Sequence, residues 1–298
     1  MKHIFILIMI VLFANSTHSQ NNYNRLWKEV EKFEIEGLPK SALEIVEQIA
    51  NQAKSDNNSP QIIKTLLFKS KFALILEEDA QLKIITDFKV EIANSKTPTK
   101  NVLENILANL YWQYFQQNRW KFYNRTDTTE KVDANDFRTW DLQTLFDEVH
   151  ILFQNSLQNG LLLQQANLNE FDVILHKQKD SKVYRPTVYD FLSHNALQFY
   201  KTTENNITQP AYKFQIDDYK FLSNAEKFAS LNITSKDSTS LQLNALKIYQ
   251  DLIQFHLKDK EPYALADVDI KRLLYVKQHA TFSDENDKLL KTFSRLSL

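Results

Sequence analysis

Two pairs of aspartate and histidine are the side chains whose types and spacing could do chemistry. Asp190 and His194 are four residues apart, and Asp147 and His150 are three apart, so each pair shares one face of a predicted helix. A carboxylate and an imidazole are both ligands that Zn²⁺ accepts. No third ligand is close in sequence and no HExxH motif occurs, so we favour hydrogen bonding between helices or to solvent and assign no metal ligand.

Other acidic residues and nucleophiles do not complete a site either. Asp267 and Asp269 resemble the start of a calcium loop, but the glycine and the distal glutamate are absent, and acids near a helix N-terminus are the better interpretation. The chain has no cysteine and no serine elbow. Paired carboxylates for glycoside hydrolysis stay open, because their spacing is three-dimensional. We expect a protein that is not an enzyme, with no catalytic or metal-binding residue to name.

Glycine is scarce, with two residues in 298, Gly37 and Gly160. Loops that bind nucleotides or phosphates use glycine for positive φ and for close approach of the backbone to the ligand. A Rossmann loop, a P-loop and a nucleophile elbow each need several glycines in a short window, so all three are excluded. We expect no cofactor.

Aromatic residues crowd one stretch, with basic residues between them. They are Tyr111, Trp112, Tyr114, Phe115, Trp120, Phe122 and Tyr123. Aromatic and cationic side chains together can form a binding surface. The favoured alternative is a thick core between helices, with the polar tips of tyrosine and tryptophan turned outward. The residues of any binding surface are therefore unknown from the sequence.

The first residues predict export. A basic start at Lys2 and His3 precedes an apolar run over residues 4–14, which is too short to span a hydrocarbon core of about 30 Å. We expect a signal peptide over residues 1–19, cleaved after Ser19; a buried helix or a signal anchor is the alternative. The protein would be periplasmic, outer-membrane-associated or extracellular. Without cysteine it is not a lipoprotein, and no transmembrane segment is expected after cleavage.

The overall charge is close to neutral. The formal net charge of the full chain is −1. A nucleic-acid or anionic-membrane partner would need a basic field, so neither is expected. The partners should be proteins, or further domains of the same longer protein.

Apolar spacing predicts helices along most of the chain. The stripe of Ala42, Ile45, Val46, Ile49 and Ala53 has helical periodicity. Proline or glycine marks several ends: Gly37 as a helix terminator, Ser59 as an N-cap before a proline, and Gly160 as the end of a helix. Predicted helices include residues 26–37, 79–94, 139–159, 185–200, 241–253 and 268–278. Residues 121–138 and 202–219 are predicted loops, and 169–178 could be strand or helix.

Helix pairs of this length predict an all-α fold. We expect a helical-repeat array of antiparallel helix pairs, an α-solenoid like those of tetratricopeptide (TPR) repeats, with a plain helical bundle as the alternative. Residues 20–120 would form TPR-like repeats, in which Trp27, Gly37 and Ala42 loosely match repeat positions. Residues 121–298 would form a second helical region, continuous with the first and truncated at its C-terminus.

Several segments resemble the N-terminal helical region of large bacterial alpha-2-macroglobulin-like proteins, the family with MG2 domains. The most specific match runs from Tyr184 to Leu192 and continues at Ala196 and Leu197. Further matching residues are Leu110, Tyr111, Trp112, Gln113, Tyr114, Asn118, Arg119, Trp120, Lys121, Asn124, Arg125, Thr126, Trp140, Asp141, Leu142, Ala245, Leu246, Tyr249, Gln250, Phe255, His256, Ala264, Leu265, Asp267, Arg272 and Leu273. The matches span most of the chain and assign no site residue.

The resemblance implies an exported protein in which β-sandwich domains follow the helical region and trap proteases. This chain has neither the β-sandwich region nor the cysteine of a thioester. We therefore expect a non-catalytic scaffold in a protease-inhibition and envelope-defence context, as a fragment of a longer protein or a stand-alone remnant. The alternative is an exported TPR-like adaptor that binds protein or peptide partners.

Overall fold

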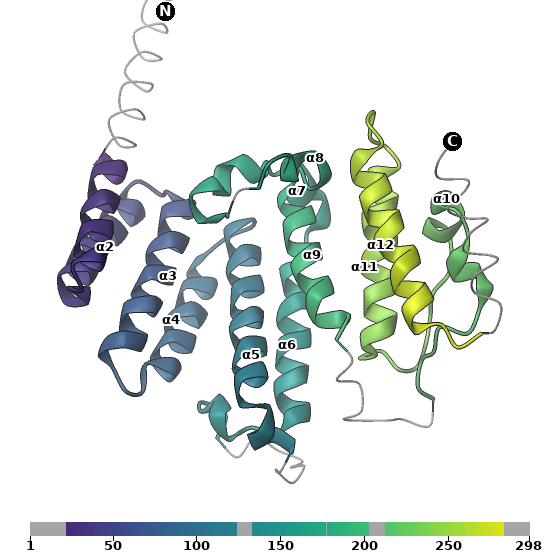
Figure 1. Ribbon diagram of the computed structural model, residues 1–298, viewed down its shortest axis with the longest axis horizontal. Helices are drawn as coiled ribbons and strands as arrows, with labels where there is room; N and C mark the ends of the chain where they lie inside the picture. The colour runs from purple at the N-terminus through teal and green to yellow at the C-terminus, as the bar shows by residue number, and fades with distance from the viewer. Residues whose placement is uncertain (1–21, 124–132, 177, 203–211, 283–298) are drawn as a thin grey trace, which may run out of the picture. The chain divides into compact units, whose positions relative to one another are not determined.

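The computed structural model describes residues 22–123, 133–176, 178–202 and 212–282. Every regular element in these ranges is a helix, packed in neighbouring pairs, which confirms the predicted all-α repeat array (Figure 1). No β-strand forms in the described ranges, where two isolated bridges link Asn167 to Thr187 and Ile216 to Ala280. The predicted signal peptide and the segment after Ser283 lie outside them.

The chain divides into two compact units. Unit 1 comprises residues up to Glu91 together with Glu170–Leu175, and unit 2 comprises Ile92–Asn169 together with the residues from His176 onward. Across the described residues, no helix is both long and apolar enough to cross a membrane.

Unit 1 starts with three consecutive helices, a helix over residues 22–35, α2 (Pro39–Ser55) and α3 (Ser59–Leu76), and contains α4 (Ala80–Asn94) up to Glu91. The turn after the first helix is made by Gly37 at φ +71°, whose N–H donates to Glu34 while Leu38 donates to Phe33. Asn57, at φ +52°, makes the corresponding turn after α2. Both turns have the hydrogen bonds of a Schellman motif, which satisfies the last carbonyls of a helix and reverses the chain.

The core of unit 1 comes from the predicted apolar stripe of α2. Ala42, Val46, Ile49 and Ala53 are buried, and they pack with Tyr23, Leu26 and Val30 of the first helix and with Phe72 of α3. One detail differs from the prediction. The N-cap of α3 is Asn58, whose side chain accepts from the Gln61 N–H, and Ser59 is the first helical residue. Asparagine caps as well as serine, and proline is tolerated throughout the first turn.

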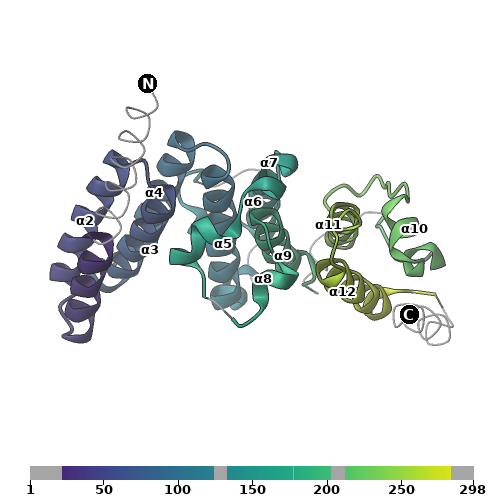
Figure 2. The same ribbon diagram turned by 90° about the horizontal axis from the view of Figure 1, so that it is seen from above.

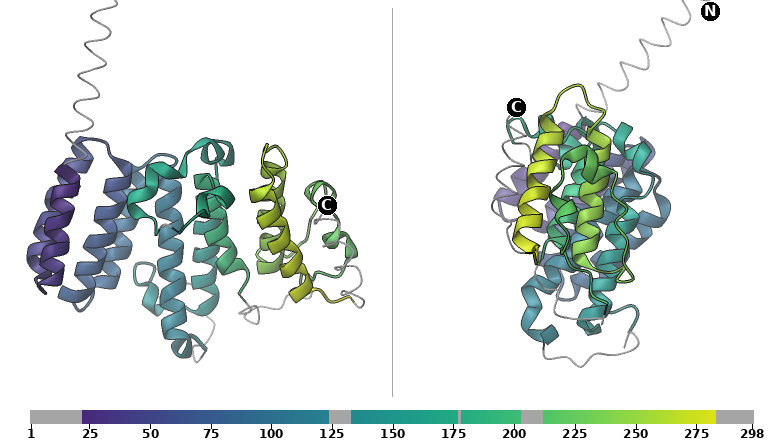
Figure 3. Two further views of the ribbon diagram at one scale, coloured as in Figure 1. Left: turned by 45° about the horizontal axis from the view of Figure 1, so that its top comes forward. Right: turned by 90° about the vertical axis from the view of Figure 1, so that its right-hand side faces the viewer.

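Unit 2 is built around α5 (Thr99–Tyr123), α6 (Leu142–Ser156) and α9 (Val188–Tyr200), which lie side by side in Figure 1 and in Figure 3. A second pair, α11 (Leu241–His256) and α12 (Tyr263–His279), is seen nearly end-on in Figure 2. The shorter helices of the unit are α7 (Gly160–Gln165), α8 (Ser181–Tyr184) and α10 (Ala225–Ala229), with 3-10 turns at Phe137–Thr139 and Tyr219–Leu222. A further 3-10 turn, Leu168–Ile174, belongs mostly to unit 1 and occupies most of the stretch for which the sequence allows either strand or helix.

The crowded aromatics of α5 are mostly core, as favoured from the sequence. Tyr111 stacks on Trp140 at 5.7 Å between ring centroids, and Trp112 packs against Phe115, Phe146 and Phe199. Trp120 and Tyr123 are instead exposed, by 66% and 60%. Burial of Phe122 against Phe115, with centroids 5.6 Å apart, accompanies the extension of α5 into the predicted loop.

The end of α6 differs from its sequence-based prediction. The helix stops at Ser156, and Gly160 begins α7 rather than ending α6. Asn159 takes the left-handed turn at φ +60° in its place. The side-chain amide of Asn101 donates to the carbonyls of Ser156 and Gln158, at 3.1 and 3.0 Å, which satisfies carbonyls that the helix end leaves open.

Candidate functional site

The two aspartate–histidine pairs singled out from the sequence are not joined in the structure. Asp147 accepts from Gln143, while the His150 Nδ1 contacts the Tyr200 hydroxyl at 2.9 Å. Asp190 bonds a histidine of another helix, and the buried Nε2 of His194 has no hydrogen-bond partner among the described residues. No group of three His, Cys, Asp or Glu side chains in the described ranges could hold a metal ion.

Asp190 takes part in a buried charged cluster of unit 2 instead. His256 on α11 lies between two carboxylates, with Nε2 at 2.7 Å from Asp190 and Nδ1 at 2.7 Å from Asp259. Burial by itself lowers the pKa of His256, but the hydrogen bonds and charges of Asp190 and Asp259 outweigh it, so the net shift is upward. Asp190 also completes the capping box of α9, whose N-cap is Thr187, because it accepts from the Thr187 N–H and hydroxyl. The cluster therefore connects α9 to the end of α11.

A second buried charge, Arg272 on α12, also serves the fold. Its guanidinium is fully buried and pairs with Asp269 one turn earlier. It donates to the carbonyls of Phe221 at 2.6 Å and Ser223 at 2.9 Å, and it lies 4.6 Å from the centre of the Phe228 ring. Asp267 pairs with Lys271. Both acids of the calcium-like motif are thus engaged by basic side chains of α12.

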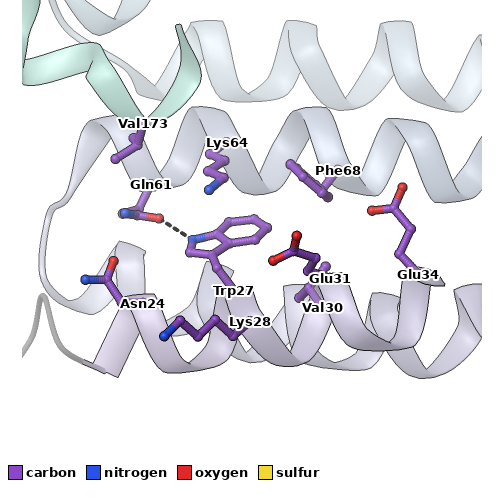
Figure 4. Close-up of a pocket in the computed structure, with 10 residues that line it drawn as sticks. All are labelled: Asn24, Trp27, Lys28, Val30, Glu31, Glu34, Gln61, Lys64, Phe68 and Val173. Carbon is purple, nitrogen blue, oxygen red and sulfur yellow. Dashed lines mark hydrogen bonds between the residues drawn. The ribbon is translucent and has the colours of Figure 1, made fainter. Parts of the chain in front are cut away.

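Among the described residues, a candidate for binding is a hollow in unit 1 between the first helix and α3, which we call the Trp27 hollow (Figure 4). Its volume is about 520 Å³, within the range of about 300–1,000 Å³ typical of ligand sites. Residues at helical spacing on both helices line it, together with one from the segment Glu170–Leu175. They are Asn24, Trp27, Lys28, Val30, Glu31, Glu34, Gln61, Lys64, Phe68 and Val173.

Trp27 is the centre of this hollow. Its indole N–H donates to the Gln61 side-chain oxygen at 2.7 Å, and its ring packs against Phe68 at 4.7 Å between centroids. The Lys64 ammonium lies 4.0 Å from the centre of the indole ring, a cation–π contact. These contacts hold the indole in one orientation while the side chain stays half-buried.

Lys64 gives the hollow its main electrostatic feature. The side chain is half-buried, and desolvation lowers its pKa, with partial compensation from the negative charge of Glu31. Within the described residues, no carboxylate forms an ion pair with its ammonium, whereas Lys71 on the same helix pairs with Glu34. A partly dehydrated ammonium of this kind favours an anionic group that enters the hollow.

Sequence reasoning did not find this site. On the sequence alone Trp27 is only a loose repeat position, and the aromatic stretch of α5 is the more conspicuous candidate. In the structure Trp112 is buried in the core, whereas Trp120 is exposed. The sequence does contain one indication of the site. Gln61, Lys64 and Phe68 are spaced to share one face of a helix, and a single helix separates that helix from the one with Trp27.

The residues that carry the family resemblance lie largely in unit 2. The segment from Tyr184 to Leu192 contains the Thr187–Asp190 cap of α9, and His256 bonds that same Asp190. Arg272, also among the matching residues, holds the Tyr219–Leu222 turn through its contact with the Phe221 carbonyl. These matching residues therefore have structural contacts in the helical core.

Comparisons with family models, with curated proteins and with solved structures found no match to this chain.

Proposed function

We propose that this chain is a non-catalytic helical scaffold that holds a segment of a partner protein outside the cytoplasm. The observation that carries the proposal is the Trp27 hollow, a fixed aromatic platform beneath a half-buried ammonium with which no carboxylate of the described residues forms an ion pair. Stacked helices commonly present such surfaces to protein partners. The basic and apolar N-terminal residues support an exported location.

The buried polar groups support a scaffold rather than an enzyme. His256 and Arg272, which have the chemistry to act on a substrate, are both buried between helices and bonded to carboxylates and carbonyls of the same unit. Groups engaged in this way stabilise a fold.

Site-specific photo-crosslinking in the source cells tests the scaffold proposal. Lys28, at the exposed edge of the Trp27 hollow, is replaced by a photoreactive amino acid, and Lys40 on α2, also exposed but outside the hollow, is the control. We expect a discrete crosslinked protein from position 28 and none from position 40. A chain that crosslinks to no protein from position 28 contradicts the proposal.

A second proposal is that the chain forms the N-terminal helical part of an alpha-2-macroglobulin-like protein, in a protease-defence setting. What supports it is the sequence resemblance, whose residues Thr187, Asp190, His256 and Arg272 make hydrogen bonds within unit 2. An immunoblot of source cells with an antibody to this segment tests it. We expect a band several times larger than 35.1 kDa. A band at the size of the signal-cleaved chain overturns this proposal and leaves the stand-alone adaptor.

A further inference from the structure

We propose that the Trp27 hollow binds an extended peptide segment in which an acidic side chain contacts Lys64, an apolar side chain lies against Trp27 and Phe68, and a basic side chain contacts Glu31. The inference rests on the scaffold function proposed above and names the chemistry of the partner segment.

The length of the hollow fits an extended segment. Its lining residues on the first helix run from Asn24 to Glu34, which at about 1.5 Å per residue corresponds to about 15 Å. An extended chain advances about 3.3 Å per residue, so four or five peptide residues fill this length. A single small anion would leave most of the hollow empty.

Lys64 is the reason to expect an acidic residue in the bound peptide, and its position indicates where in the peptide that residue lies. The ammonium is partly desolvated, and in the described part of the chain no carboxylate pairs with it. Lining residues continue on both sides of it, toward Gln61 in one direction and toward Phe68 in the other (Figure 4). The carboxylate should therefore come from a side chain within the segment rather than from a chain end.

Charge is distributed unevenly along the hollow, which sets the order of the remaining contacts. Asn24, Lys28 and Gln61 offer hydrogen-bond donors at one end, and the carboxylates of Glu31 and Glu34 lie toward the other (Figure 4). Glu34 is already paired with Lys71, whereas Glu31 acts on Lys64 through its charge but forms no ion pair with it in the described residues. Once an acidic side chain of the peptide contacts Lys64, Glu31 is the acceptor for a basic side chain. Between the two ends, Trp27 and Phe68 form the apolar surface, with centroids 4.7 Å apart.

Fluorescence anisotropy with four-residue peptides, blocked at both ends, tests the assignment on the full mature chain. The reference peptide carries glutamate, two leucines and lysine, and its variants replace glutamate by glutamine or lysine by norleucine. We expect the glutamine variant to bind wild type about tenfold more weakly than the reference peptide. The Lys64→Met protein should bind the reference peptide and the glutamine variant equally. The ammonium that recognises the carboxylate is gone, while a side chain of similar length remains. Glu31→Gln should likewise remove the preference for lysine.

Lys69→Met is the matched control, since Lys69 is on the same helix and half-buried but pairs with Glu47 outside the hollow. It should keep the wild-type preference for the acidic peptide. Loss of that preference in Lys69→Met, or its survival in Lys64→Met, contradicts the assignment. An unblocked peptide without glutamate can bind as tightly as the reference peptide only through its terminal carboxylate. That result would show that Lys64 binds the end of a chain and not an acidic side chain.

The two experiments test the scaffold proposal and the proposed peptide chemistry separately. If no peptide binds wild type while Lys28 still crosslinks to a protein in cells, the scaffold proposal stands and the acidic–apolar–basic peptide chemistry is wrong. If neither result is obtained, both are wrong.

Discussion

Replacing Arg272 with methionine is expected to lower the free energy of unfolding of unit 2 by about 3–5 kcal/mol, the loss typical of breaking one side of a buried ion pair. The substitution leaves Asp269, which is 1% exposed, as an uncompensated buried carboxylate. It also removes the donors to the carbonyls of Phe221 and Ser223. Methionine keeps much of the side-chain volume, so the loss reports the charge and the hydrogen bonds rather than a cavity.

Urea unfolding followed by tryptophan fluorescence in a Trp27→Phe background measures this loss. The remaining tryptophans, Trp112, Trp120 and Trp140, all belong to unit 2. Adding Asp269→Asn to Arg272→Met should restore about 1 kcal/mol or more, because the second change removes the stranded charge. A single variant that unfolds within about 1 kcal/mol of the wild type would show that Arg272 does not hold the Tyr219–Leu222 turn in place.

Unit 2 should be most stable between two histidine titrations that act in opposite directions. The pKa of His256 is raised in the folded state, so its contribution is complete below the unfolded value of about 6.5 and is lost as the pH rises through the folded value. Burial, with smaller effects from the positive charges of Arg185, Lys271, His256 and Lys201, lowers the pKa of His194 to about 3. A neutral His194 therefore resists protonation, and stability falls as the pH drops from about 6.5 toward 3.

Urea unfolding at a series of pH values, in the same Trp27→Phe background, separates the two histidines. His256→Gln should lose about 2–3 kcal/mol at pH 6, where it gives up charged hydrogen bonds to Asp190 and Asp259, and progressively less at higher pH. His194→Gln should leave the loss of stability at high pH unchanged and make the loss of stability at low pH less steep. The lowered pKa values of His150 and His279 keep part of that low-pH loss. If His256→Gln lost the same stability at every pH, the imidazolium would have no part in the contact.

Local pattern was enough to predict most helices. The stripe that includes Val46 and Ile49 is the buried face of α2. The helix predicted over residues 185–200 forms as α9, which begins after Thr187, an N-cap with a complete capping box. Short-range competition between neighbouring residues produced the errors: Asn58 caps α3 in place of Ser59, and Asn159 takes the left-handed turn in place of Gly160. Asparagine is favoured both as an N-cap and in the left-handed conformation. The sequence alone therefore does not show whether asparagine or the neighbouring serine or glycine takes the position.

The contacts that define the two most distinctive features are non-local, which is why the sequence did not reveal them. His256 and Asp190 are separated by 66 residues, and Trp27 and Gln61 by 34. Helical periodicity places each side chain on a face of its own helix but says nothing about which helix that face meets. The aromatic stretch of α5 was visible in the sequence because its residues are close together in the chain. Most of these residues pack in the core and do not form a binding surface.

Asp190 links local and long-range order in unit 2. One carboxylate accepts from the first turn of α9, through Thr187, and from His256 of α11. If α9 frays at its start, the Asp190 carboxylate is no longer held in position to accept from His256. If α11 moves away, Asp190 loses the positively charged imidazole that stabilises its negative charge, and its hydrogen bonds to Thr187 weaken. The start of α9 and its attachment to α11 therefore open and close as one cooperative unit rather than as two independent events.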